Sequence, residues 1–553
     1  MSQCLIPSQL DANFHTQVEN VKIFSTCEAG TSPAFWKGVY KFMFTLNHRK
    51  RGRVIAVALA SSLTLMGVMG VGISSSASAA ATVNIGISAD MDKLDPQTST
   101  NFATVRILGV VYSELVESTT DLKIVPGLAK SWYWNTDSTQ LTMYMNAGVK
   151  FHDGSNFTAV DAKASIERVM NTATGASARA NTTLISSVVA KGAQLIIRFS
   201  APNAPFLAAL DGVNMAMLSK KDIDAGVIGK KVNGTGPYKF VSWTPGQSVK
   251  LTTNATYYKG APTVAGLNFQ IIPAEASILA AANAGTIDFA YIGNPAIAKQ
   301  VGSNLNIQKR GSLGYHVLQL NARVKPFDNL NVRLAIACAI DRQQVVDTAA
   351  LGEGNPAGPF TMPAYRSGLD ARPCPTGDVA KAKKYLAAAG YPNGLTINVM
   401  TEGGEYALAT PIALNIQSQL AKAGITMKID AFDAATYIPK WLAGDFGAAV
   451  ANNGGRVDPD PMYTRYFTST GNLNKVSGYS SPTLDALFLQ GKSTGNVSRR
   501  LVTYKKITAE LETKAVWVWL FTPNDYYISS KSFSGFTPNP NGSLLELRNA
   551  KLA

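Results

Sequence analysis

The chain has 553 residues, which is enough for two or three domains with large buried cores. A hydrophobic fraction of 46% and a charged fraction of 16% are typical of a globular protein and exclude an intrinsically disordered chain. The formal net charge is +15, but the basic residues beyond residue 80 are scattered rather than grouped in blocks. This scatter indicates a solvated basic surface and argues against a nucleic-acid partner.

The first feature along the chain is an uncharged apolar run at residues 54–73. Basic residues precede it and the small residues Ala77–Ala79 follow it, which is the three-part pattern of a secretory signal peptide. We therefore expect a signal peptide at residues 43–80, with an uncleaved membrane anchor as the alternative, since about 20 apolar residues can span a bilayer. Residues 1–42 fit neither a signal nor a domain, so we interpret them as an extension upstream of a true start at Met43.

An exported protein is therefore expected, located in the periplasm or outside the cell at the outer face of the cytoplasmic membrane. Beyond the signal the chain keeps two cysteines, Cys338 and Cys374. An even pair in an exported protein is typical of a disulfide. A buried free thiol is the alternative, because Cys338 lies in an apolar helical pattern.

Strands and helices alternate along the rest of the chain. Val83–Ile87 alternates as a strand does, and residues 102–117 have the pattern of an amphipathic helix. Residues 141–145 and 194–199 are predicted strands, with a helix at about 159–170 between them. Further strand and helix patterns repeat to the end of the chain, so the sequence predicts an α/β fold with repeated βα units.

The stretch "VKFHDGSNFTAVDAKASIERV" contains His152, one of four histidines in the chain, beside an aspartate and a glycine. The pair Asp153–Gly154 is typical of a turn. Thr158 and Asp161 have the spacing of a capping box that starts a helix. We therefore interpret this stretch as a turn and a capped helix rather than as a catalytic site.

Two short motifs resemble those of enzymes, but the secondary structure predicted around them differs from what the enzymes need. "GKSTG" (Gly491–Gly495) matches a nucleophile elbow, but helical patterns flank it on both sides, whereas an elbow needs a preceding strand. "GEGNPA" (Gly352–Ala357) resembles a dinucleotide loop but follows a helix. The two histidines beyond the signal, His152 and His316, have no second ligand at metal-binding spacing. We expect no enzyme activity, no cofactor and no protein-built metal site; a metal inside a chelate remains compatible with the sequence.

Nine segments, in this order, resemble the extracytoplasmic solute-binding proteins of peptide- and nickel-type ABC importers, over nearly all of residues 82–523. They are "LDP" (94–96), "PGLAKSW" (126–132), "GVKFHDGSNFTAVDAKASIERV" (148–169), "NGTGPYKF" (233–240), "NAGTIDFAY" (283–291), "NVRLAIACAIDR" (331–342), "AKAKKYLAAAGYPNG" (380–394), "VDPDP" (457–461) and "YSSPTLDALF" (479–488).

The resemblance implies a two-lobed periplasmic-binding-protein-like fold with a hinged cleft. The first lobe is expected at residues 82–312, with a subdomain at about 129–231 and completion by 516–553; the second lobe is expected at 313–515. Such a protein is a receptor that captures a peptide or similar small solute and delivers it to an ABC permease and ATPase complex. We expect it to act as a monomer. The alternative from the residues alone is a secreted hydrolase or transferase on an α/β scaffold.

The resemblance also implies where the ligand lies. The position of the acid that holds the peptide amine in relatives is Gly455 here, and Arg456 adds a positive charge. We therefore expect a more neutral or partly anionic ligand, with Asn452, Asn453 and Arg456 as donors, unless Asp458 is shifted into the role of the acid. A register slip that leaves Arg456 in solvent is the alternative interpretation.

The facing contacts are expected from loops that follow strand ends, where α/β sheets bind ligands. These residues are Asn101, Phe102, Tyr291 and Asn294. Trp519, in an apolar run, is more typical of core packing than of a cleft.

Overall fold

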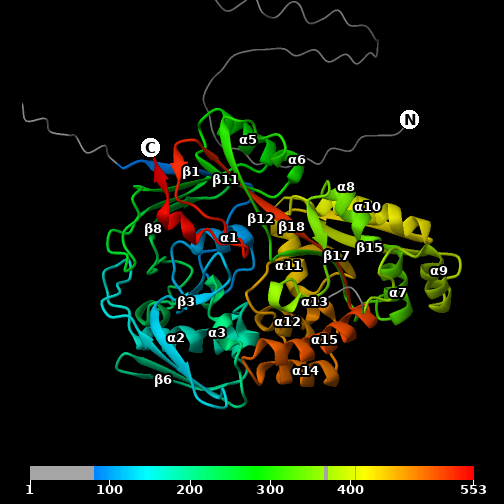
Figure 1. Cartoon of the computed structure of the whole chain (residues 1–553), viewed down its shortest axis with the longest axis horizontal. Coiled ribbons are helices and arrows are strands. Elements are labelled where there is room, and N and C mark those ends of the chain that lie inside the picture. Colours follow the sequence, from blue (N-terminus) through cyan, green and yellow to red (C-terminus); the bar gives the residue numbers. More distant parts are fainter. Residues whose placement is uncertain (1–79, 367–370, 405) are drawn as a thin grey trace, which may run out of the picture. The chain divides into compact units, whose positions relative to one another are not determined.

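The computed structural model describes residues 80–366, 371–404 and 406–553 (Figure 1). The predicted upstream extension and almost all of the predicted signal peptide lie outside the described residues. Within these ranges, no helix is both long and apolar enough to cross a membrane. Strands and helices are mixed throughout, as the βα pattern predicts.

The first lobe contains one side of a twelve-stranded sheet. Its strand β1 (Thr82–Ile87) is parallel to both β10 (Gly266–Ile271) and β11 (Phe289–Ile292). Val83 and Ile85 of β1 are buried, as their alternation predicts. The other elements here are β2 (Val116–Ser118), β3 (Ile124–Pro126), β8 (Tyr238–Thr244), β9 (Ser248–Thr253), β12 (Leu305–Gly311), β19 (Phe533–Ser534), β20 (Lys551–Leu552), α1 (Phe102–Leu108), α4 (Lys220–Asp224), α5 (Glu275–Asn283) and α6 (Pro295–Ala298).

A separate four-stranded antiparallel sheet lies within the segment at about 129–231, where a subdomain is predicted. Helix α2 (Ala159–Met170) packs its buried face, which includes Ile166 and Val169, onto a core shared with that sheet. The remaining subdomain elements are β4 (Ala129–Trp134), β5 (Gln140–Met145), β6 (Ile185–Lys191), β7 (Gln194–Phe199) and α3 (Phe206–Ala209).

The second lobe contains the other side of the large sheet. Here β15 (Leu395–Glu402) is parallel to β16 (Ile425–Phe432) and β17 (Ala448–Asn453), with β13 (Tyr315–Leu320) antiparallel to β17. The other elements of this lobe are β14 (Gly354–Pro356), α7 (Leu330–Ala339), α8 (Arg342–Ala349), α9 (Val379–Ala388), α10 (Ala409–Lys422), α11 (Ala434–Ala443), α12 (Asp460–Phe467), α13 (Asn474–Ser477), α14 (Pro482–Lys492) and α15 (Val497–Thr513).

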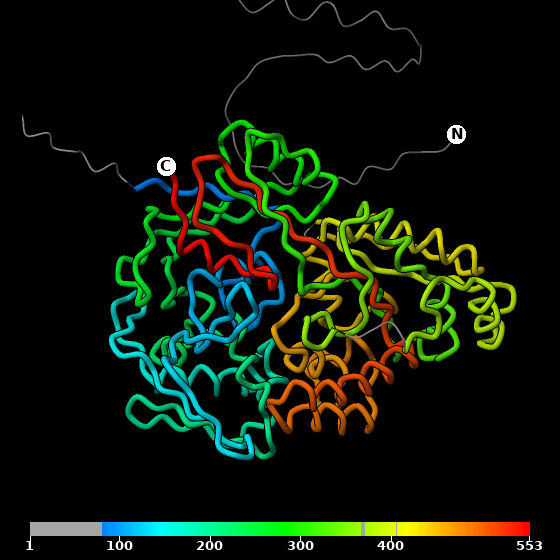
Figure 2. Tube along the Cα trace, in the orientation of Figure 1, coloured from blue at the N-terminus to red at the C-terminus, as the bar shows by residue number. Residues whose placement is uncertain are grey.

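One long strand belongs to both lobes. The first half of β18 (Trp517–Ser530) pairs with β13 and β14 of the second lobe, and its second half pairs with β11 and β12 of the first lobe. The chain makes its other passage between the lobes at residues 312–314, which join β12 to β13. Figure 2 shows these two segments running beside each other.

The stretch around His152 is structural. The Thr158 side chain and the Asp161 carboxylate form the predicted capping box of α2, which confirms the interpretation as a helix start. His152 Nε2 lies 3.1 Å from the carbonyl oxygen of Gly236, and burial lowers the pKa of this histidine to about 4.

The predicted helix at 102–117 is wrong in length, because α1 ends at Leu108. The carbonyls of Val110 and Val111, which a longer helix would use internally, accept hydrogen bonds from Tyr238 and Gly236. The long-range pairing thus replaces the last turns of the predicted helix.

Candidate ligand-binding site

A cavity of about 100 Å³ lies between the two lobes. The first lobe lines it with Phe102 and Arg106 of α1 and with Tyr291, and the second lobe with Asn452 and Arg456. A neighbouring cavity of about 90 Å³ shares Phe102, Asn452 and Arg456 with the first. The two cavities therefore form adjoining compartments of one site.

The loop after β17 supplies the wall from the second lobe. At Gly455 an added β-carbon would overlap the backbone and side chain of Leu313. The chain therefore has no room for a side chain at the position where relatives are expected to hold an acid.

Arg456 reaches from this loop to the first lobe. Its Nη1 lies 3.5 Å from the carbonyl oxygen of Asp211, and its Nη2 lies 3.4 Å from Oδ1 of Asn214. An added β-carbon at Gly212 would overlap the guanidinium. Burial lowers the pKa of Arg456, and Asp211 opposes that change. Arg456 is thus a cation held between the lobes at the cavity wall.

A second cation lines the opposite part of the cavity. The guanidinium carbon of Arg106 lies 4.0 Å from the centre of the Tyr291 ring, within the range of a cation–π contact. The Tyr291 hydroxyl donates a hydrogen bond of 3.0 Å to Asp525. Burial raises the pKa of Asp525, while Arg106 acts to lower it. This wall is therefore pre-ordered by contacts within the first lobe.

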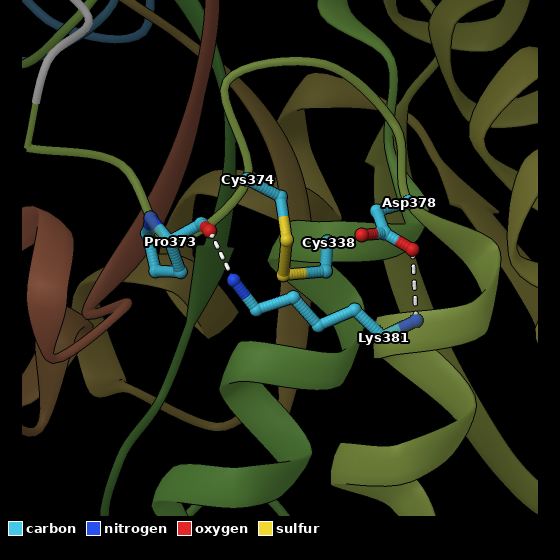
Figure 3. Close-up of a disulfide and its surroundings, with 5 residues drawn as sticks. All are labelled: Cys338, Pro373, Cys374, Asp378 and Lys381. Carbon is cyan, nitrogen blue, oxygen red and sulfur yellow. Dashed lines mark hydrogen bonds between the residues drawn. A yellow bond between two sulfur atoms is a disulfide. The ribbon is translucent and has the colours of Figure 1, made fainter.

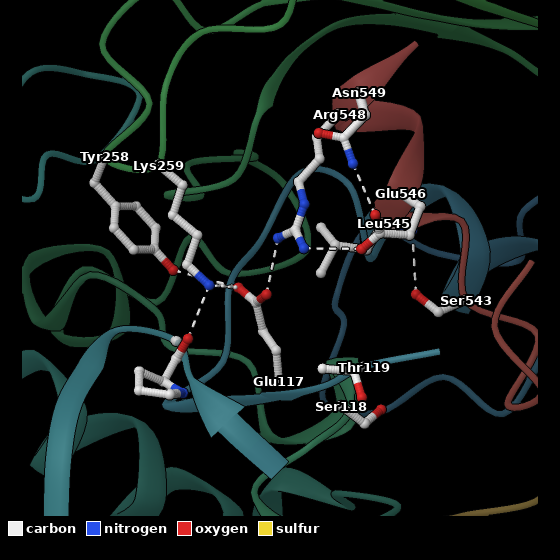
Figure 4. A network of polar contacts seen from close by, with 12 residues as sticks. Glu117, Ser118, Thr119, Tyr258, Lys259, Ser543, Leu545, Glu546, Arg548 and Asn549 are labelled. Atoms are coloured by element: carbon white, nitrogen blue, oxygen red, sulfur yellow. Dashed lines mark hydrogen bonds and ion pairs between the residues drawn. The ribbon is translucent and has the colours of Figure 1, made fainter. Parts of the chain in front are cut away.

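Acidic residues of the first lobe complete the cavity wall. Glu117 is neutralised by Lys259 and Arg548, with distances of 2.8 Å to each (Figure 4). Glu114 and Asp211 lie beside this network, and burial raises the pKa of both carboxyl groups. The cavity thus combines two guanidinium groups with several carboxylates, which suits a dipolar solute better than an apolar one.

The adjoining compartment is aromatic. Phe102, Tyr406, Tyr437, Trp441 and Tyr466 line it. The Trp441 Nε1 donates to Gln319 at 2.7 Å and the Tyr437 hydroxyl donates to the Val450 carbonyl at 3.1 Å, so their polar atoms are satisfied within the protein. This compartment offers ring surfaces to an apolar part of a ligand.

The structure brings five of the residues predicted from the sequence to the two compartments. They are Phe102, Tyr291, Asn452, Asn453 and Arg456. Asn453 lines the aromatic compartment, where its Nδ2 donates to the Tyr315 hydroxyl at 3.1 Å. Trp519 is fully buried in the core of the second lobe.

Three predicted residues are not among the residues that line the two compartments, and their contact with a ligand stays a prediction. Asn101 caps α1 by accepting from the Thr104 N–H, and Asn294 caps α6 in the same way. Asp458 accepts a hydrogen bond of 2.7 Å from Arg500 in the interior of the second lobe. An asparagine before a helix and an acid after a strand fit a structural role as well as a ligand contact.

Sequence reasoning missed Arg106, Glu114, Asp211 and Asp525. Arg106 could have been predicted as a cavity residue, because it follows Phe102 by four residues and so shares its helix face. Asp525 is a buried acid of β18 that lies directly before the apolar residues Tyr526–Ile528, which is also informative. Glu114 and Asp211 lie far apart in the sequence and meet only through the fold.

Cys338 and Cys374 are joined by a disulfide (Figure 3). Cys338 lies on α7, and Cys374 lies in the loop that leads to α9. Lys381 Nζ donates to the Pro373 carbonyl at 2.8 Å, and Asp378 accepts from the Lys381 N–H at 2.8 Å. The disulfide holds the loop against α7, and the contact of Lys381 with Pro373 ties it to the start of α9.

The two motifs that resemble enzyme motifs both lie in connections that follow helices. Ser493 ends α14 and donates to the Gln490 carbonyl at 2.8 Å, and the "GKSTG" motif connects two helices. "GEGNPA" follows α8 and contains β14. Among the described residues, no group of three or more His, Cys, Asp or Glu is arranged to hold a metal ion.

Comparison with known proteins agrees with this geometry. The glutathione-binding protein GsiB of Pectobacterium atrosepticum is 27% identical over 474 residues, covering 81% of this chain and 90% of the relative. The periplasmic binding protein AgaA of A. tumefaciens R10, solved with agropinic acid, has a TM-score of 0.80 at 26% identity, covering 85% of this chain and 99% of that one. The binding protein DppA of Helicobacter pylori, solved with the peptide STSA, has a TM-score of 0.78 at 26% identity, covering 85% and 98%.

The sequence profile described as "Bacterial extracellular solute-binding proteins, family 5 Middle" matches residues 123–475, more than half of the chain. With this match, the two-lobed α/β fold and the cavity between the lobes, the protein belongs to the bacterial extracellular solute-binding proteins of family 5.

Proposed function

We propose that the protein is the extracytoplasmic receptor of an ABC-type importer and captures a peptide or similar small solute between its lobes. The observation that carries this proposal is a cavity whose charged and polar walls come from both lobes. A solute that touches both walls binds the closed arrangement more tightly than an open one, so it shifts the population toward closure. The closed form would then deliver its solute to a permease and ATPase complex at the membrane.

The proposed ligand contacts are Phe102, Tyr291, Asn452, Asn453 and Arg456, with Arg106 added from the structure. The guanidinium groups suit a carboxylate, the carboxylates suit an ammonium group, and the aromatic compartment suits a side chain. A short peptide or peptide-like zwitterion carries all three. In line with this, the named relatives bind glutathione, agropinic acid and a peptide.

The same proposal covers the remaining expectations. The protein acts outside the cytoplasmic membrane after export through the segment at residues 43–80, as a monomer and without catalytic chemistry. Binding and release need no nucleophile and no resident cofactor, because the conformational change is driven by the contacts that the solute makes.

Native mass spectrometry of the exported protein tests the proposal by identifying a co-purified solute. Thermal shift with peptides, glutathione, sugars and chelated metals provides the second measurement. A solute at a hundred times its Kd is expected to stabilise the folded protein by about 2.7 kcal/mol. Absence of both a co-purified solute and any shift would contradict a receptor function.

A further inference from the structure

Glu114 is an unusual member of the cavity wall. It lies just before β2 and lines the cavity, yet only 6% of its surface is exposed. Among the described residues, no side chain donates a hydrogen bond or forms an ion pair with its carboxylate, whose one donor there is the backbone N–H of Glu114 itself. A buried carboxylate with one backbone donor keeps unfilled acceptor positions, which is costly in free energy, so its position in the wall of a ligand cavity needs an explanation.

The other acids along the same wall have partners. Glu117 is bound by Lys259 and Arg548, and Glu546 by Arg548 at 2.8 Å. Asp525 accepts from the Tyr291 hydroxyl, as described above. The remaining acid, Asp211, accepts a hydrogen bond of 3.0 Å from the Ser118 N–H. The unfilled acceptor positions on this wall are therefore concentrated at Glu114.

The charges near Glu114 leave a negative excess. Asp211 and Glu117 raise the pKa of Glu114 further after burial has raised it, and Arg456 opposes them. Lys259 and Arg548 neutralise Glu117 and Glu546, and Arg106 acts on Asp525. Glu114 and Asp211 therefore share the one remaining guanidinium of the cavity wall, that of Arg456. A ligand cation at this place would remove the excess.

We propose that Glu114, with Asp211 beside it, forms a subsite that accepts the ammonium group of the solute. An ammonium group has three N–H donors and no acceptor, so it can fill the acceptor positions of a carboxylate to which no other side chain donates. This inference rests on the proposed receptor function and narrows its substrate class to solutes with a free amine. It also places the amine on the first lobe, opposite the loop of residues 451–461.

Matched pairs of probes test the subsite by calorimetry. The probes are dialanine, trialanine and reduced glutathione, each with its N-acetylated counterpart, which keeps the carboxylate but lacks the ammonium charge. With the unaltered protein, acetylation is expected to weaken binding roughly 10- to 100-fold, the usual effect of losing a charge-assisted hydrogen bond.

Glu114→Gln is expected to weaken binding of the free-amine probes to a similar extent and to leave the acetylated probes unchanged, so that the preference disappears. Asp211→Asn is the second variant and should reduce the same preference if Glu114→Gln does not fold. The control is Glu167→Gln on the exposed face of α2, where Glu167 pairs with Lys163; it should keep the full preference.

Three outcomes would count against the inference. Equal binding of free and acetylated probes by the unaltered protein would overturn the subsite while leaving the receptor function in place. An unchanged preference in both Glu114→Gln and Asp211→Asn would do the same. Failure of all six probes, together with no co-purified solute, would overturn the receptor function and the subsite with it.

Discussion

The guanidinium of Arg456 occupies the space beside Gly212 that a β-carbon would fill. Gly212→Ala is therefore expected to displace Arg456 and weaken solute binding roughly tenfold, because a charged contact is worth about 1.5 kcal/mol. Calorimetry with the identified solute measures the change. Gly246→Ala is the control, since Gly246 also has a positive φ of 70° but open space around it. Undiminished affinity in Gly212→Ala would show that the solute does not use Arg456.

His316 gives the fold a dependence on pH. It is buried against Phe521, and burial lowers its pKa to about 3, whereas the unfolded chain protonates near 6.5. As the pH falls below 6.5, His316 binds a proton in the unfolded state, whereas in the folded state it binds one only below about pH 3. The free energy of unfolding therefore falls on acidification. The loss at pH 5 is about 2 kcal/mol from this residue.

Urea denaturation at pH 7 and pH 5 measures this loss. In His316→Gln the difference in unfolding free energy between the two pH values should be about 2 kcal/mol smaller than in the unaltered protein. His152→Gln should reduce the difference by a similar amount, because burial also lowers the pKa of His152 to about 4, and the two reductions should add in the double variant. Equal pH differences in His316→Gln and the unaltered protein would contradict the assignment.

The sequence predicted the roles of single residues correctly where their interaction partners lie in the same short segment. Thr158 and Asp161 form the predicted cap because both partners lie within one turn. Glu114 and Asp211 escaped prediction because an isolated acid in a sequence carries no sign of its distant neighbours. Asn101 and Asn294 cap helices, and their contact with a ligand stays a prediction, because an asparagine before a helix serves a cap and a ligand equally well in a sequence pattern.

At the scale of elements, two helices show how local sequence signals and distant hydrogen bonds each determine where a helix ends. Helix α2 has the predicted bounds, since its capping box and its apolar face agree. The pattern at residues 102–117 is also apolar and periodic, but the backbone of Val110 and Val111 is paired to residues 236 and 238 instead. Periodicity identifies an apolar segment, whereas distant hydrogen bonds decide where its helix ends.

The disulfide acts on the elements that it joins, α7 and the loop before α9. Replacing both cysteines by alanine should lower the unfolding free energy by roughly 3–4 kcal/mol, the chain entropy that a cross-link over 36 residues removes from the unfolded state. Denaturant unfolding measures the change, and the unaltered protein in reducing agent should show a similar loss. Equal midpoints with and without the cross-link would contradict this role.

At the scale of the whole molecule, a few contacts outside the cavity join the lobes. The Ala204 N–H donates to the Lys492 carbonyl at 3.0 Å, and Asn472 lies 3.4 Å from the carbonyl oxygens of Ala176 and Ser177. Lys299 also donates to the Leu351 carbonyl at 3.1 Å, and Lys309 pairs with Glu353. A solute that touches both lobes is expected to add its contacts to these and to favour closure.

Small-angle X-ray scattering should therefore show a smaller radius of gyration with the identified solute than without it. Arg456→Ala should need a higher solute concentration for the same change, because it removes a contact between the lobes. A radius that stays constant while calorimetry shows binding would contradict closure driven by the solute.

The class of fold was predictable at this scale because strands and helices alternate in the sequence. The single twelve-stranded sheet was not, since the two apolar halves of its joining strand, separated by a polar segment, do not reveal which strands each half pairs with. Pairing partners are set by three-dimensional registry, which a run of apolar residues does not encode.

That joining strand, β18, has a consequence for the order of folding. It comes after every other strand of the sheet along the chain, yet both lobes depend on it for a central hydrogen-bonded partner. During synthesis, neither lobe can complete its sheet until residues 517–530 have emerged from the ribosome. A chain that must cross a membrane before it folds would benefit from this delay, because both lobes stay unfinished until nearly the whole length is available.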